Sequence, residues 1–174
     1  PKPLQYISEA YKELGDEDKA LEYNQQYMDK NPNAAPTDFM KLAEIYINKA
    51  KKDPAKKVEN IDKAIGVYAK LAEKYPTLKP FAKLQEGNTA FQNELDDKAI
   101  AAYTEVINEL EAKQCDEDEL SYLKTSYQYM GFIYTYDKQD FNTAKPYWDK
   151  LLKLDPQNKL ANDAYEKAGL KPGE

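Results

Sequence analysis

The stretch YISEAYKELGDEDKALEYNQQYMDKNPNA, from Tyr6 to Ala34, decides the fold of this chain. Its apolar and aromatic residues recur at three- and four-residue spacing, which is typical of amphipathic helices. Gly15 favours a left-handed helix end, Asp16 favours a new helix start, and Pro32 stops a helix. The stretch therefore predicts two helices joined by a tight turn.

The same arrangement recurs along the chain. YQYMGFIYTYDKQDFNTAKPYWDKLLKLDPQN, from Tyr127 to Asn158, repeats it clearly, and two weaker copies lie between. Each copy has an alanine early in its second helix, and these alanines lie 44, 35 and 45 residues apart: Ala20, Ala64, Ala99 and Ala144. In three copies an aromatic residue follows the alanine by four positions, whereas the first copy has Asn24 there. Such a period predicts stacked units without a single central core.

This pattern resembles the tetratricopeptide repeat, a helix–turn–helix unit of about 34 residues. The resemblance covers essentially the whole chain and implies an all-α superhelix, or solenoid. We expect one domain over residues 1–174, with units at about 3–34, 36–77, 79–111 and 117–157 and a capping helix at 158–169. Extra residues fall around Lys49 to Val58 and Glu111 to Glu119. Because the chain begins at Pro1, inside what resembles a repeat, we expect it to be a piece of a longer protein.

Capping signals predict where the later helices begin. Thr37 or Asp38 is a plausible N-cap in the second unit, and Asp116 is one in the fourth. Pro146 is tolerated best in a first turn, where amide donors lack partners, so we place the start of its helix near Asn142. The predicted capping helix buries a face made of Leu160, Ala161 and Tyr165.

Composition excludes several classes of function. The net charge is −6 and the pI is near 4.9, which disfavours nucleic acid as a partner. The chain has neither His nor Arg, so it lacks the commonest general base, the commonest metal ligand and the bidentate phosphate fork. We predict no catalytic residues, no metal site and no cofactor. Cys115 lies in an acidic stretch and is interpreted as incidental. No apolar run is long enough to span a membrane directly.

Two charged runs have an ordinary interpretation beside a functional one. The lysines from Lys49 to Lys57 could contact phosphate or lipid, but a solvated helix extension and turn explains them better. The acidic run from Asp116 to Glu119 resembles a calcium loop only superficially, since it lacks the alternating ligands, the Gly and the distal Glu. Carboxylates at a helix start, favoured by the helix dipole, account for it.

The resemblance implies a binding groove along the first helices of the units, which line the concave face in this family. The polar and aromatic positions there point to a protein or peptide partner. We predict a site in the C-terminal half of the groove, formed by Gln85, Gln92, Asn93, Gln128, Tyr129, Phe132 and Tyr136. The rings among them could instead belong to the packing between helices, and that alternative stays open.

The leading hypothesis is a non-catalytic scaffold that binds a protein or an extended peptide. The alternative is a repeat module of a bacterial cell-envelope lipoprotein that supports complex assembly or glycan binding. The sequence leaves the compartment open between cytoplasm and cell envelope. Some family members grip the carboxylate ends of chaperones with Lys, Asn and Arg, but the matching positions here are Gln5, Glu9, Lys41, Ala82 and Glu86. We therefore predict no affinity for such tails.

Overall fold

A computed structural model describes residues 2–173, and the regular elements in that range are helical. The α-helices are α1 (Lys2–Glu13), α2 (Glu17–Lys30), α3 (Pro36–Lys52), α4 (Lys57–Lys74), α5 (Lys79–Gln92), α6 (Asp96–Leu110), α7 (Glu117–Phe132), α8 (Phe141–Leu154) and α9 (Lys159–Lys167). Short 3-10 turns η1 (Pro54–Lys56) and η2 (Pro76–Leu78) precede α4 and α5, and a π-helical turn η3 (Ile133–Asp137) extends α7. The predicted all-α solenoid is confirmed.

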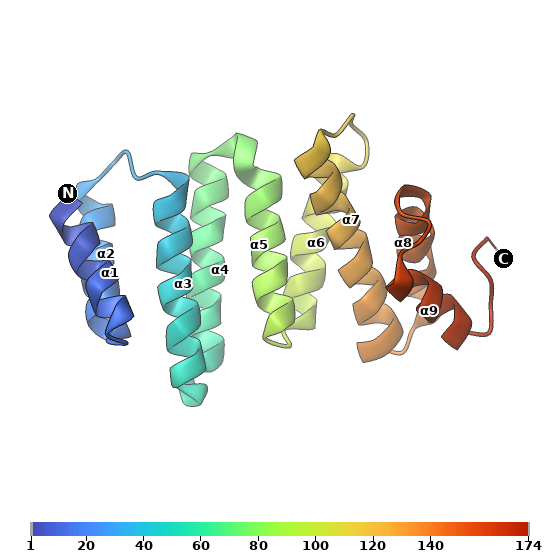
Figure 1. Cartoon of the computed structure of the whole chain (residues 1–174), viewed down its shortest axis with the longest axis horizontal. Coiled ribbons are helices and arrows are strands. Elements are labelled where there is room, and N and C mark those ends of the chain that lie inside the picture. Colours follow the sequence, from blue (N-terminus) through green and yellow to red (C-terminus); the bar gives the residue numbers. More distant parts are fainter. Residues whose placement is uncertain (1, 174) are drawn as a thin grey trace.

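The helices form a row of antiparallel pairs, with the two ends of the chain at opposite ends of the row (Figure 1). Within the pairs, α1 packs on α2, α3 on α4, α5 on α6 and α7 on α8. Between pairs, α2 packs on α3, α4 on α5 and α6 on α7. The first helices α1, α3, α5 and α7 therefore share one layer, and their partners lie behind them in Figure 1.

Small residues let the two helices of a pair approach closely. The repeated alanines are completely buried, with 0% exposure: Ala20, Ala64, Ala99 and Ala144. Glycines on the facing helices receive the large rings. A Cβ added to Gly87 would lie 2.6 Å from the Tyr103 ring, and one added to Gly131 would lie 2.5 Å from the Trp148 ring. The recurring spacing of small and large residues in the sequence thus corresponds to direct contacts between helices.

Three local predictions about the helices were wrong. Helix α3 begins at Pro36, and Asp38 lies in its first turn with its carboxylate accepting the Ala35 N–H at 2.8 Å. Helix α8 begins at Phe141 with Asp140 as its N-cap, so Pro146 lies inside the helix rather than in the first turn.

The third error concerns the capping helix α9. Its buried face consists of Ala161, Ala164 and Tyr165, whereas Leu160 is 36% exposed. Asn158 is the N-cap of α9, and Gly169, two residues after its last residue, takes a left-handed φ of 70°.

The insertion in the second unit lengthens α3 and adds the turn η1. Lysines of the predicted solvated run lie in this extension and reach back to the first unit. Lys49 pairs with Asp18, and Lys52 pairs with Glu17 at 2.7 Å. Lys52 also donates to the Gly15 carbonyl at 2.7 Å. These bonds hold the extension against the turn between α1 and α2. The sequence pattern had indicated only a solvated run of lysines.

Candidate binding surfaces

The three predicted site rings come together between α5 and α7. The Tyr129 ring lies 4.6 Å from the Phe91 ring and stacks on Tyr103 at 5.6 Å, measured between centroids. Phe132 meets Phe91 edge-on at 5.6 Å and Tyr136 at 4.8 Å. We call these five residues the ring ladder. Its α7 and η3 members are all half-buried, so they take part in packing while keeping one part accessible.

Tyr136 occupies the π-helical turn rather than an ideal α-helix. The extra residue of a π-turn changes which way the following side chains face, and such turns are frequent at functional sites. Here Thr135 turns inward and accepts the Trp148 Nε1–H at 2.9 Å. The ammonium group of Lys167 lies 4.6 Å from the centre of the Tyr136 ring, so a cation–π contact ties the ladder to α9. Nothing in the periodicity had indicated the π-turn.

A cavity of about 410 Å³ opens beside this turn. Residues from η3, α8 and α9 line it, among them Thr135, Tyr136, Phe141 and Lys167. One edge of the ring ladder therefore borders a depression large enough for a side chain of a partner.

The predicted amides are dispersed in their roles. The Asn93 side chain donates to the Thr89 carbonyl at 2.8 Å and so helps to end α5. Gln128 accepts from the Asn158 amide at 3.2 Å and connects α7 to the start of α9. Gln92 is exposed and Gln85 is half-buried. The structure thus links Tyr129 to Phe132 and Tyr136 through Phe91, while two of the four amides already form bonds within the chain.

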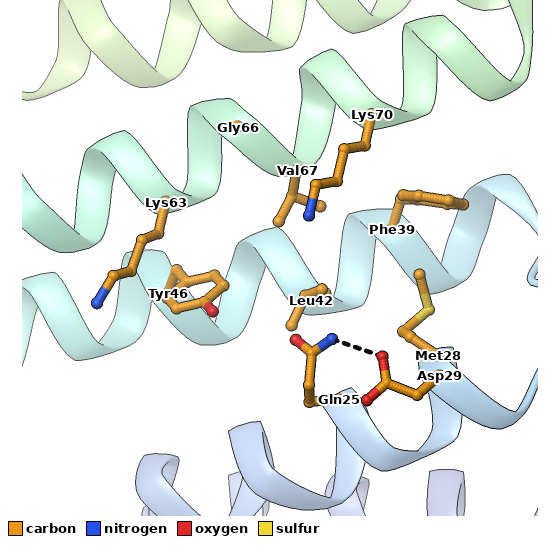
Figure 2. A pocket seen from close by; sticks show the side chains of 10 residues that line it. All are labelled: Gln25, Met28, Asp29, Phe39, Leu42, Tyr46, Lys63, Gly66, Val67 and Lys70. Carbon is orange, nitrogen blue, oxygen red and sulfur yellow. Dashed lines mark hydrogen bonds between the residues drawn. The ribbon is translucent and has the colours of Figure 1, made fainter.

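A second depression, of about 390 Å³, is lined by residues of α2, α3 and α4. Figure 2 shows its apolar floor, which includes Phe39 and Leu42 of α3. Lys63 and Lys70 of α4 stand along one side. Across from them Gln25 donates to Asp29 at 3.0 Å. The residues that line this depression come from three helices and share no motif, so no sequence pattern indicated it.

Several ion pairs join neighbouring units. Lys41 pairs with Glu9, and this hydrogen bond raises the pKa of the lysine. Lys12 pairs with Glu44 at 2.7 Å. These bonds connect α1 to α3 along the layer of first helices. Lys41 is the lysine among the positions that match the clamp for chaperone carboxylates. Its ammonium group already pairs with Glu9.

The described residues offer little for catalysis. Within residues 2–173, no group of three or more His, Cys, Asp or Glu side chains is arranged to hold a metal ion. Glu86 is buried beside Lys83 at 3.1 Å, and its burial raises the pKa of the carboxyl group. Cys115 donates its S–H to the Leu110 carbonyl at 3.3 Å, and burial raises the pKa of the thiol. A raised thiol pKa disfavours the reactive thiolate.

The comparisons with known proteins agree with this geometry. A family model described as tetratricopeptide repeat matches residues 4–34 and 39–77. Residues 4–34 and 39–77 are therefore tetratricopeptide repeats. The matched segments coincide with the α1–α2 and α3–α4 pairs, and the remaining pairs continue the same stacking. Proteins with this fold generally mediate protein–protein interaction and are typically non-catalytic scaffolds. No curated protein sequence matched the chain.

Solved structures share the fold at low sequence identity. One is the C-terminal part of a TPR repeat-containing protein from Cytophaga hutchinsonii, with a TM-score of 0.68 and 21% identity over 92% of this chain. Another is the human IFIT1 dimer with PPP-AAAA, with a TM-score of 0.61 and 17% identity over 94% of this chain. The chain spans 58% of the first protein and 36% of the second. At these identities the likeness establishes the fold alone.

No helix within residues 2–173 combines the length and the apolar character needed to cross a lipid bilayer.

Proposed function

We propose that this tetratricopeptide-repeat chain is a non-catalytic scaffold that binds an extended peptide segment of another protein along its first helices, at the ring ladder. The observation that supports the proposal is the run of half-buried rings beside the cavity at the π-turn. Binding energy concentrates in a few aromatic anchors, and a ring that is already held in place loses little freedom on binding. Within this proposal, the residues predicted for the groove remain the candidate contacts with the peptide.

The test compares two tyrosines of the same π-turn. Tyr136 belongs to the ring ladder, whereas Tyr134 stacks on Tyr147 of α8 at 6.1 Å. Linear peptides selected from a phage-displayed random library are titrated by calorimetry against wild type, Tyr136→Ala and Tyr134→Ala. Losing an aromatic anchor costs about 2 kcal/mol or more, so we expect Tyr136→Ala to weaken binding by roughly thirtyfold.

We expect Tyr134→Ala to bind the selected peptides as wild type does. Equal affinities for wild type and Tyr136→Ala, with unchanged helical circular dichroism, would contradict the ring-ladder site. Failure to select any peptide, together with binding on a glycan array, would favour the envelope alternative instead.

A further inference from the structure

The first repeat unit departs from the other three at one buried position. Four residues after the buried alanine, the later units carry Tyr68, Tyr103 and Trp148, which are 4%, 0% and 0% exposed. Tyr103 and Trp148 pack against a glycine of the first helix of their own unit. The Tyr103 ring also reaches Tyr129 of α7. The first unit has Asn24 instead, which is shorter and polar yet only 3% exposed.

A cavity of about 180 Å³ opens where the ring is missing. Helix α1, α2 and α3 all contribute to its wall, and we call it the Asn24 cavity. Its inner residues are Ser8, Asn24 and Ile45, each at most 3% exposed. Its outer residues include Glu9 and Lys41, which are half-buried. A water molecule occupies about 30 Å³ in the liquid, so the cavity has room for one side chain of a partner.

The carbonyl oxygen of the Asn24 side chain is left without a hydrogen-bond partner. Its Oδ1 atom is buried and accepts no bond from any described residue. Native proteins pair nearly all of their buried polar groups, so an exception calls for an explanation such as an absent water or ligand. In the other units this position tolerates a large ring, which shows that the fold does not require a polar group here.

The neighbouring polar groups are already satisfied. The Ser8 hydroxyl donates to the Ala20 carbonyl at 2.7 Å. At the outer end Lys41 pairs with Glu9. A guest therefore meets balanced charge around it and the carboxamide of Asn24, with its unpaired carbonyl oxygen, at the inner end. The best complement to a carboxamide is a second one, because each group offers both an N–H donor and a carbonyl acceptor.

We propose that the Asn24 cavity receives the carboxamide side chain of a glutamine or asparagine from the bound peptide. The guest carboxamide pairs with Asn24, and the methylene groups of the guest pack on Ile45. This inference rests on the proposed function for the source of the side chain. A charged guest of either sign is less suited, because Lys12 and Lys41 line the cavity together with Glu9 and Glu13, so it would meet a like charge.

The experiment uses a small probe, so that it does not depend on the partner. N-acetyl-glutamine N-methylamide is titrated into the isotope-labelled chain, and the side-chain amide signal of Asn24 is followed by NMR. We expect saturable shifts at Asn24, Ser8 and Ile45. The matched leucine and lysine probes, which differ only in the side chain, should bind at least about tenfold more weakly, since neither can pair with the carboxamide.

Asn24→Leu keeps the size of the side chain and removes the carboxamide, so it should abolish the preference for the glutamine probe. Gln26→Leu makes the same exchange on α2 outside the Asn24 cavity and should leave the preference intact. Asn24→Tyr restores the ring of the other units and should abolish binding of every probe.

Three outcomes would overturn the inference. Equal shifts with the leucine probe would mean an apolar cavity, and stronger binding of the lysine probe would mean a cationic guest. Absence of saturable shifts with all probes would mean that water alone fills the cavity. These results are independent of the ring ladder, because Tyr136→Ala leaves the Asn24 cavity untouched.

Discussion

Single residues decide how closely the helices of a unit approach. Gly131 leaves no space for a methyl group, since the added Cβ would lie 2.5 Å from the Trp148 ring, a fully buried side chain. Gly66 of α4 is the opposite case, with no neighbouring atom within 4 Å of an added Cβ. The same residue type thus has a packing role at one site and none at the other.

The two glycines give a matched prediction. Gly131→Ala should lower the free energy of unfolding by about 1–3 kcal/mol because it overpacks the contact with Trp148. Gly66→Ala should raise it by about 0.5–1 kcal/mol because alanine favours the helix without meeting a neighbour. Chemical denaturation followed by circular dichroism measures both changes. A stabilised Gly131→Ala variant would show that the α7–α8 contact is looser than described.

At this scale the sequence predicted burial well and exposure poorly. The alanines Ala20 and Ala144 are buried as their spacing indicated. Tyr129, by contrast, shares its ring between packing on Tyr103 and the accessible surface. A residue-spacing argument assigns a ring to one side of a helix, but it does not reveal the neighbouring ring that it contacts. The candidate site was therefore predictable as a set of positions, and its division between packing and binding was not.

At the scale of elements, bonds that reach between helices fix the helix ends. Asp38 in the first turn of α3 is 4% exposed, and its carboxylate accepts from three groups. These are the Tyr27 hydroxyl at 2.8 Å, the Ala35 N–H at 2.8 Å and the Gln5 amide at 3.1 Å. The local sequence pattern favoured Asp38 as a possible N-cap. The bonds to α1 and α2 come from residues far away in sequence, which no local signal contains.

Removing this carboxylate should loosen the first unit from the second. We expect Asp38→Ala to destabilise the chain by about 1–3 kcal/mol, since it leaves the buried Tyr27 hydroxyl and the Ala35 N–H without this acceptor. Tyr27→Phe keeps the carboxylate but removes the hydroxyl that donates to it and that accepts from the Asn31 amide, and should cost about 1–2 kcal/mol. Urea unfolding of the two variants measures the difference. Equal stability of Asp38→Ala and wild type would contradict the coupling.

At the scale of the whole molecule, the apolar core is distributed unevenly. One buried cluster contains Trp148, Tyr103 and Tyr165 of the C-terminal units, and another contains Phe39, Tyr68 and Leu71 of the second unit. The buried residues of α1 and α2 include the polar side chains Ser8, Glu17 and Asn24. Because stability in a solenoid is a sum of units and neighbouring contacts, the first unit contributes least.

This gradient predicts the order of local unfolding. Amide hydrogens of α1 and α2 should exchange with solvent earliest among the paired helices, and those of α6 and α8 should exchange last. Hydrogen–deuterium exchange with mass spectrometry measures the order. Protection of α1 and α2 equal to that of α6 would show that the ion pairs from α3 compensate for the smaller apolar core.

The arrangement of the two chain ends has a mechanical consequence. Because they lie at opposite ends of the row (Figure 1), a tensile load applied to both ends passes through every seam between units in series. The weakest seam then yields while the others hold. Under tension we expect the α1–α2 pair to detach first. The C-terminal pairs, which contain Tyr103 and Trp148, should detach last. The molecule should therefore lengthen stepwise under load, starting from its N-terminal end.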